Sequence, residues 1–137
     1  MEQKLEAYRR ERNFLKTSEP SGKEEKAVGV KKRKIFAVQL HYARTTHFDF
    51  RLEWDGVLLS WAVPKGPSFN PKDKRLAVRV EEHPLDYADF EGVIPKGEYG
   101  GGTVLLWDKG YWTETEDFAR GLEKGSLKLR LDGTRLT

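Results

Sequence analysis

Residues 47–54 alternate strictly between polar and apolar side chains. Such alternation is typical of a β-strand, because successive side chains point to opposite faces of a sheet. One face of the expected strand is apolar and consists of Phe48, Phe50, Leu52 and Trp54. The other face carries His47, Asp49, Arg51 and Glu53. We expect the apolar row to pack in a core, whereas the polar row combines groups that can bind a metal ion and a phosphate.

Similar patterns predict further strands at residues 35–42, 57–63, 75–81, 103–107 and 126–131, and one helical turn at 116–122. Asp55-Gly56 is a strong signal for a two-residue hairpin. Residues 84–102 are expected to form a long loop that ends in a sharp bend at three consecutive glycines. Short strands and frequent turns favour a mainly β fold. We predict a compact antiparallel β-barrel with one or two short helices and a polar groove on one side.

The N-terminal residues 1–34 are rich in charge and are expected to pack on the barrel or lead into it. Residues 1–16 predict a short helix or a tail. The basic run at residues 31–34 is most simply a solvated linker; attraction to phosphate is a second reading and a targeting signal a weaker third. The barrel itself would span residues 35–137, so that the chain forms a single domain overall.

Composition narrows the class of protein. The chain has 137 residues and a net charge of +3, which is compatible with a nucleic-acid partner without establishing one. Cysteine is absent, which excludes disulfides and thiolate metal sites, so a metal ion would need His, Asp, Glu or water as ligands. No apolar run is long enough to cross a membrane and the start is not a signal peptide, so we expect a cytoplasmic protein without a membrane partner. We also expect a monomer.

The three histidines of the chain, His41, His47 and His83, lie on polar faces of expected strands or just past their ends. Two imidazoles and one carboxylate are a common ligand set for a divalent transition metal. His41, Asp49 and His83 would form that set, although strand parity alone does not distinguish His41 from His47. Any single histidine is more simply read as an ordinary, partly exposed side chain.

Basic side chains near this expected group suggest phosphate chemistry. Arg51, Arg75 and Lys65 could neutralise charge that develops on phosphoryl oxygens. His47 is left as a transition-state stabiliser or a general acid.

With these residues in view, the chain resembles the phosphoesterase domain of bacterial DNA ligase D and its stand-alone bacterial and archaeal relatives. The matching stretches are QLHYAR at 39–44, HFDFRLE at 47–53, SWAVPKGPS at 60–68, RLA at 75–77, VEEHPLDY at 80–87 and FEGVIPKGEYG at 90–100. Arg12, Thr17, Glu19 and Pro20 also match the family's N-terminal motif. Several linked motifs in the right order are more specific than any one of them.

The resemblance implies a manganese-dependent enzyme that trims 3′ ends of DNA or of DNA–RNA primer-templates. It removes a terminal ribonucleoside, then the 3′-phosphate that remains, and leaves a 3′-hydroxyl. Zn²⁺ or Co²⁺ would also suit the ligands, and a DNA ligase and a polymerase or primase are the implied partners. By motif match, His41, Asp49 and His83 resemble metal ligands. His47, Arg51, Lys65, Arg75 and Tyr87 resemble catalytic residues, and Gln39, Arg12, Asn13 and Glu19 occupy supporting positions.

Two departures from the family pattern affect these expectations. Asn13 stands where the family usually has Asp, and a neutral amide cannot act as a base or a strong metal ligand. The chain also stops at Thr137, where relatives run on into further strand sequence, so the last strand is truncated, missing or supplied otherwise. Two other readings stay open: a non-catalytic barrel that holds single strands with Trp and Arg, and a docking module of a repair complex.

Overall fold

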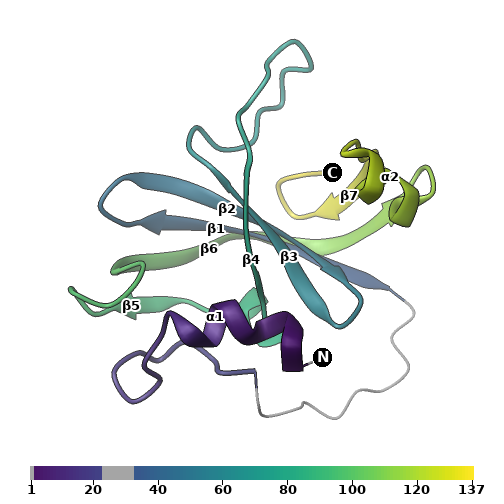
Figure 1. Ribbon diagram of the computed structural model, residues 1–137. Helices are drawn as coiled ribbons and strands as arrows, with labels where there is room; N and C mark the ends of the chain where they lie inside the picture. Colours follow the sequence, from purple (N-terminus) through teal and green to yellow (C-terminus); the bar gives the residue numbers. More distant parts are fainter. Residues whose placement is uncertain (1, 23–32) are drawn as a thin grey trace.

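A computed structural model describes residues 2–22 and 33–137 of the chain. Figure 1 shows one antiparallel sheet, curled into a half-barrel, in the order β4-β3-β2-β1-β6-β5, with β7 also paired to β6. The strands are β1 (Lys34–Tyr42), β2 (Thr46–Trp54), β3 (Val57–Val63), β4 (Val78–His83), β5 (Gly92–Ile94), β6 (Gly102–Glu114) and β7 (Leu129–Gly133). The helices are α1 (Glu6–Arg10) and α2 (Phe118–Lys124), with 3₁₀ turns η1 (Glu2–Leu5) and η2 (Leu85–Asp89). The mainly β prediction is therefore confirmed.

The β1–β2 hairpin sets the positions of the polar residues. His41 pairs with His47, and Gln39 pairs with Asp49 on the same face. At the other end of β2, the turn to β3 has positive φ at both Asp55 (53°) and Gly56 (82°). This backbone is that of a type I′ turn and confirms the expected hairpin.

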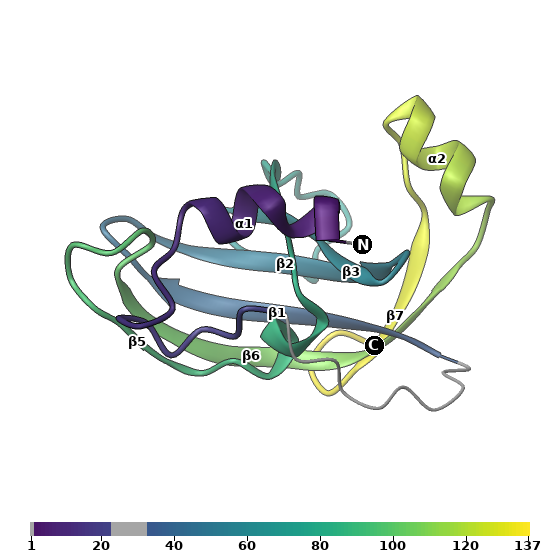
Figure 2. The same ribbon diagram turned by 60° about the horizontal axis from the view of Figure 1, so that its bottom comes forward.

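Both faces of the central strands are covered. The apolar row of β2 packs with a core that includes Phe36, Val38, Leu52, Leu59, Trp112 and Phe118. A second buried group, with Tyr8, Ala37, Leu58, Tyr87, Phe90 and Ile94, lies on the side of the polar row. This side is covered by η2 and by the segment that carries α1, which lies against β4 (Figure 2). The polar residues of β1 and β2 are therefore largely shielded from water.

Several elements differ from the prediction, including the last strand, which is β7 at Leu129–Gly133 in place of residues 126–131. β4 begins at Val78, because the residues before it are exposed and hold a loop together by side-chain hydrogen bonds. β6 is longer than expected, since a register shift opposite Val38/Gln39 interrupts its alternation of polar and apolar residues. β5 and η2 lie inside the segment that was expected to be one long loop.

The basic run at Lys31 and Lys32, and the charged approach at 23–32 to which it belongs, lie outside the described residues. Among the residues that the structure describes, no helix is both long and apolar enough to span a membrane.

Candidate active site

Two histidines and one aspartate converge next to the turn that joins β1 to β2. One potential ligand atom from each of His41, His47 and Asp49 lies within 4.8 Å of the others. Oδ2 of Asp49 is 3.6 Å from Nδ1 of His41, and Oδ1 is 3.2 Å from Nε2 of His47. His41 and Asp49 are buried, and His47 is half-buried. The group is thus largely shielded from water, and His47 is its most exposed member.

Backbone carbonyls orient both imidazoles. Nε2 of His41 donates to the carbonyl of Gly100 at 2.7 Å, and Nδ1 of His47 donates to that of Thr45 at 3.0 Å. Each ring therefore has a hydrogen on the nitrogen that faces the backbone, and turns its second nitrogen toward Asp49, where that nitrogen can carry a further proton for the carboxylate or bind a metal ion. A fixed second nitrogen is the usual arrangement of a metal-binding histidine, since the outer hydrogen bond selects the tautomer.

The electrostatics of this group favour a cation between the rings and the carboxylate. Burial opposes ionisation of Asp49, but hydrogen bonds from His41 and His47 outweigh it and hold its pKa far below the usual value. The hydrogen bond with Asp49 in turn raises the pKa of His47. An ionised, buried carboxylate facing two imidazole nitrogens is satisfied by a proton or by a metal ion. Nitrogen and oxygen donors of this kind fit Mn²⁺, Zn²⁺ or Co²⁺.

Arg51 continues the polar row beside Asp49. Its side chain is only 3% exposed, and Nη2 lies 3.6 Å from Oδ2 of Asp49. Nε donates to Oε1 of Gln39 at 2.6 Å, and the guanidinium stands over the ring of Tyr87 at 4.8 Å. Nη1 is buried and has no hydrogen-bond partner within the described parts of the chain. A buried guanidinium donor of this kind is well suited to an anion oxygen.

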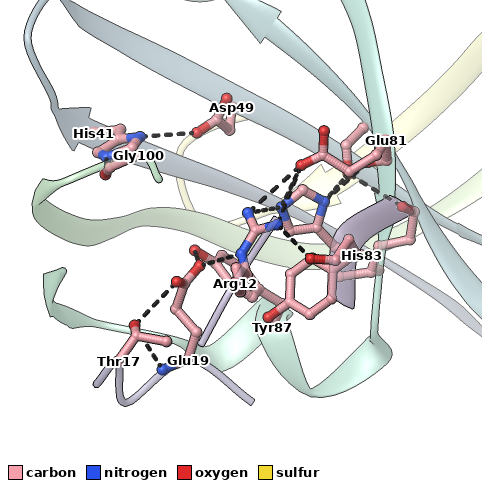
Figure 3. A network of polar contacts seen from close by, with 12 residues as sticks. Arg12, Thr17, Glu19, His41, Asp49, Glu81, His83, Tyr87 and Gly100 are labelled. Atoms are coloured by element: carbon pink, nitrogen blue, oxygen red, sulfur yellow. Dashed lines mark hydrogen bonds and ion pairs between the residues drawn. The ribbon is translucent and has the colours of Figure 1, made fainter. Parts of the chain in front are cut away.

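A second polar cluster adjoins Arg51 and is drawn in Figure 3. Glu19 accepts from the hydroxyl of Tyr87 at 2.6 Å and from Nε of Arg12 at 3.0 Å. Its other oxygen accepts from Thr17 at 3.0 Å. Burial raises the pKa of Tyr87, so this hydroxyl stays protonated and donates to the carboxylate. The N-terminal segment thereby fixes both Arg12 and Tyr87 against the sheet.

His83 belongs to this second cluster. Its ring lies between those of Tyr8 and Tyr87, with centroids at 4.9 and 4.7 Å. Nδ1 donates to the carbonyl of Glu81 at 2.9 Å, and Nε2 faces Nη2 of Arg12 at 3.4 Å. Burial, followed by the charges of Arg51 and Arg12, lowers the pKa of His83 well below its ordinary value. His83 is thus neutral, with Nε2 as an acceptor.

The structure brings most of the expected site residues together. His41, His47 and Asp49 form the first group, and Gln39, Arg51, Tyr87, Glu19, Arg12 and His83 form a continuous polar network beside it. Of the expected ligand set, His41 and Asp49 meet, together with His47, while His83 lies among Arg12 and the two tyrosines. The assignment of individual roles stays a prediction.

Three expected residues lie apart from this network. Lys65 is exposed in the segment between β3 and β4. Arg75 is in the same segment, where Nη2 approaches Oδ2 of Asp73 at 3.5 Å. Asn13 is exposed after α1, and its Oδ1 accepts from the amide of Leu15 at 3.0 Å.

Sequence reasoning did not identify the carbonyls of Gly100 and Thr45 as partners of the histidines, nor Tyr8. Every residue has a backbone carbonyl, so the sequence does not reveal which carbonyl will accept a hydrogen bond from a side chain. The expected bend at the three glycines was the available clue: Gly102 has φ of 134°, and a Cβ there would stand 2.1 Å from the carbonyl oxygen of Tyr42. This bend brings the Gly100 carbonyl to His41.

A known protein family matches most of the chain. A family described as "DNA Ligase D 3′-phosphoesterase domain" matches residues 39–137. "Multifunctional non-homologous end joining protein LigD" of Pseudomonas aeruginosa is 54% identical over 135 residues, which cover 97% of this chain and 16% of that protein. "Multifunctional non-homologous end joining DNA repair protein LigD" of Mycobacterium tuberculosis is 46% identical over 134 residues, or 98% of this chain and 17% of the relative. The chain therefore spans about one sixth of these relatives.

Proposed function

Since the chain belongs to the DNA ligase D 3′-phosphoesterase domain family, we propose that it is a metal-dependent enzyme that heals DNA 3′ ends. Its substrates are DNA or DNA–RNA 3′ ends that carry a terminal ribonucleoside or a phosphate, and its product is a 3′-hydroxyl. It works inside a prokaryotic cell, alongside a DNA ligase and a polymerase or primase. Mn²⁺ is the proposed metal, with Zn²⁺ or Co²⁺ as substitutes.

The observation that carries this proposal is the buried, unpartnered Nη1 of Arg51 beside the group of His41, His47 and Asp49. A metal-binding group alone is compatible with many functions, and a buried arginine alone with many structural roles. Their combination suits a phosphate, because one part of the site attracts a cation and the adjacent part offers a free donor to an anion.

We assign His41, His47 and Asp49 to hold the metal. The chemistry that a divalent ion supplies in such a site is Lewis-acid polarisation of a phosphoryl oxygen. In the ligand set expected from the sequence, His83 takes the place of His47. The neutral ring of His83, with Nε2 directed to Arg12, favours a role on the phosphate side instead.

Arg51 is the principal phosphate-binding residue in this proposal. Gln39 fixes its Nε, so that Nη1 is already oriented and little entropy is lost when a phosphate binds. Arg12 adds a second guanidinium, which Glu19 holds in place. Together they neutralise charge that builds up on the non-bridging oxygens while water attacks phosphorus and the bond to the leaving oxygen breaks. The leaving oxygen is the 5′ oxygen of a terminal ribonucleoside, which departs as its 5′-hydroxyl and leaves a 3′-phosphate, or the 3′ oxygen of a phosphate end, which becomes the 3′-hydroxyl as inorganic phosphate is released.

The roles proposed for the remaining expected residues rest on the family resemblance. Lys65 and Arg75, from the segment between β3 and β4, contact the phosphate from outside once a substrate is present. Tyr87 orients Glu19 and supports the guanidinium of Arg51 through its ring. A ribose 2′-hydroxyl assists when one is present; a deoxy end cleaved as fast as a ribo end would exclude that assistance.

The test is release of phosphate from a primer-template with a 3′-phosphate. The natural chain should release phosphate with Mn²⁺ and lose that activity in EDTA. Asp49→Asn should abolish release while the strand signal in circular dichroism persists. Asp132→Asn removes a carboxylate whose side chain is 67% exposed on β7, and it should react like the natural chain. No release by a folded natural chain at any Mn²⁺ concentration would overturn the proposal.

A further inference from the structure

The segment between β3 and β4, residues 64–77, holds a concentration of positive charge outside the site network. We call it the basic loop. It contains four basic residues and one acidic residue, for a net charge of +3. The whole chain also has a net charge of +3, so the charges of all other residues sum to zero. The loop is therefore a locally basic segment, as residues 31–34 of the sequence also are.

Hydrogen bonds from side chains within the basic loop stabilise its backbone. Oγ of Ser68 donates to Oδ2 of Asp73 at 2.6 Å and accepts from the amide of Asn70 at 3.1 Å. Oδ1 of Asn70 accepts from the amide of Lys72 at 3.0 Å. Asn and Ser side chains that bond the backbone two residues away stabilise a turn. The loop thus presents its charges from a defined backbone.

The only acidic residue of the loop is already engaged. Asp73 accepts from Ser68 and pairs with Arg75, with 3.5 Å from Nη2 to Oδ2. Lys72 and Lys74 are exposed, and the described residues offer neither of them an ion pair. Phe69 is 71% exposed and Leu76 is 68% exposed. Two free ammonium groups thus share a short loop with an uncovered aromatic ring.

The loop begins next to the candidate metal group. Val63, the last residue of β3, pairs with Phe48, which stands between His47 and Asp49 in β2. The loop then turns at Gly66, where a Cβ would lie 2.7 Å from the ring of Phe48. The turn therefore rests on Phe48, and the basic loop rises from the same end of the sheet as His47. The basic loop therefore starts at the end of the sheet that carries the candidate metal group.

We propose that the basic loop is a nucleic-acid-binding surface that holds the strand upstream of the reacting 3′ end. Lys72 and Lys74 bind backbone phosphates, and Phe69 stacks on an exposed base. Lysines on an ordered loop next to an exposed aromatic ring are the combination that binds a nucleic-acid strand through charge and stacking. The identity of the ligand as a 3′-ended strand rests on the proposed function. The existence of a binding surface rests on the charge and exposure of the loop residues alone.

Binding of an end that cannot react tests this surface apart from catalysis. The ligand is a fluorescent primer-template with a 3′-hydroxyl, titrated with the natural chain at several salt concentrations without added metal. Lys72→Gln with Lys74→Gln should weaken binding on the order of tenfold at 0.1 M salt and lower the slope of log K against log salt by about two. Phe69→Ala should weaken binding roughly tenfold with no change in slope.

Lys124→Gln with Lys128→Gln is the matched control, because it removes two exposed lysines from the α2–β7 region. This control should bind with the affinity and slope of the natural chain. Single-stranded and fully duplex ligands, run in parallel, identify which form the loop prefers. Circular dichroism of each variant shows that the strands are retained.

The proposed binding surface is rejected if the loop variants and the control bind the primer-template with equal affinity, or if the natural chain does not bind it. Failure of the proposed function would give a different experimental result. In that case no phosphate is released from a 3′-phosphate end, while the loop variants still weaken binding. Phosphate release with unchanged binding by the loop variants would reject the surface alone.

Discussion

Nε of Arg51 donates to Oε1 of Gln39 at 2.6 Å, and this bond joins the two parts of the site. The amide nitrogen of Gln39 donates to the carbonyls of Tyr87 and Phe90, at 2.7 and 3.0 Å. Those two bonds fix the orientation of the amide and leave its oxygen for Arg51. A single buried glutamine thereby connects β1, β2 and η2 and holds the guanidinium beside Asp49.

Gln39→Leu should therefore affect both stability and activity. The change leaves the two carbonyls and Nε of Arg51 without their partners in a buried region, which should lower the free energy of unfolding by about 2 kcal/mol or more. Phosphate release should fall on the order of tenfold or more, since Arg51 is no longer oriented. Urea unfolding and the phosphate assay measure the two effects.

Gln39→Glu is the matched variant for this position, because it retains an acceptor for Arg51 but has no donors for the two carbonyls. It should lose stability as well and keep more activity than Gln39→Leu. Full activity in a folded Gln39→Leu protein would show that Arg51 does not need this anchor.

Asn13 gives a prediction about the balance of the two reactions. Its exposed side chain only caps a turn through the amide of Leu15, so Asp fits the same position. We expect Asn13→Asp to speed removal of a terminal ribonucleoside more than removal of a 3′-phosphate. The rates of both reactions, measured with the natural chain and the variant, give the comparison. Ser18→Asp, which adds a carboxylate at an exposed site nearby, should leave the ratio unchanged. An unchanged ratio of the two rates in Asn13→Asp would contradict this prediction.

Two buried tyrosines predict the behaviour of the protein at high pH. Burial raises the pKa of both Tyr8 and Tyr87 above the ordinary value near 10. Their neutral hydroxyls donate to Pro20 and Glu19, and this stabilisation is complete below about pH 10. Above that pH the unfolded chain releases the two protons and the folded chain keeps them. The free energy of unfolding should therefore fall as pH rises beyond 10.

Ultraviolet absorbance of tyrosinate, followed together with circular dichroism, checks this expectation. In the natural chain, Tyr8 and Tyr87 should ionise only when the strand signal is lost. The Tyr8→Phe and Tyr87→Phe variants identify their contributions by difference. Ionisation of either residue while the strands persist would contradict the burial argument.

The sequence predicted the centre of the sheet better than its edges. The strict alternation in β2 and the Asp55-Gly56 turn define their structures locally, because strand parity and positive φ depend on a few neighbouring residues. β6 was underestimated, since the register shift against β1 depends on its partner strand. β5 was missed because three residues in a segment rich in Gly and Pro carry too little pattern.

The candidate site was predictable as a set of residues and less so as a geometry. Parity placed Gln39, Asp49 and Arg51 on one face, which the pairing of β1 with β2 confirms. Parity cannot say how far along that face a side chain from β4 will reach, so the neighbours of His83 were not foreseen. The N-terminal cluster around Glu19 was indicated only by family resemblance, because contacts between distant segments leave no local signal.

We propose that His41, His47 and Asp49 hold a divalent metal next to Arg51, with His83 on the phosphate side. Calorimetric titration of Mn²⁺ into the natural chain, His47→Ala and His83→Ala tests it most directly. The natural chain and His83→Ala should bind one ion with similar affinity, whereas the affinity of His47→Ala for the ion should fall on the order of a hundredfold. Retained binding in His47→Ala with loss in His83→Ala would contradict it.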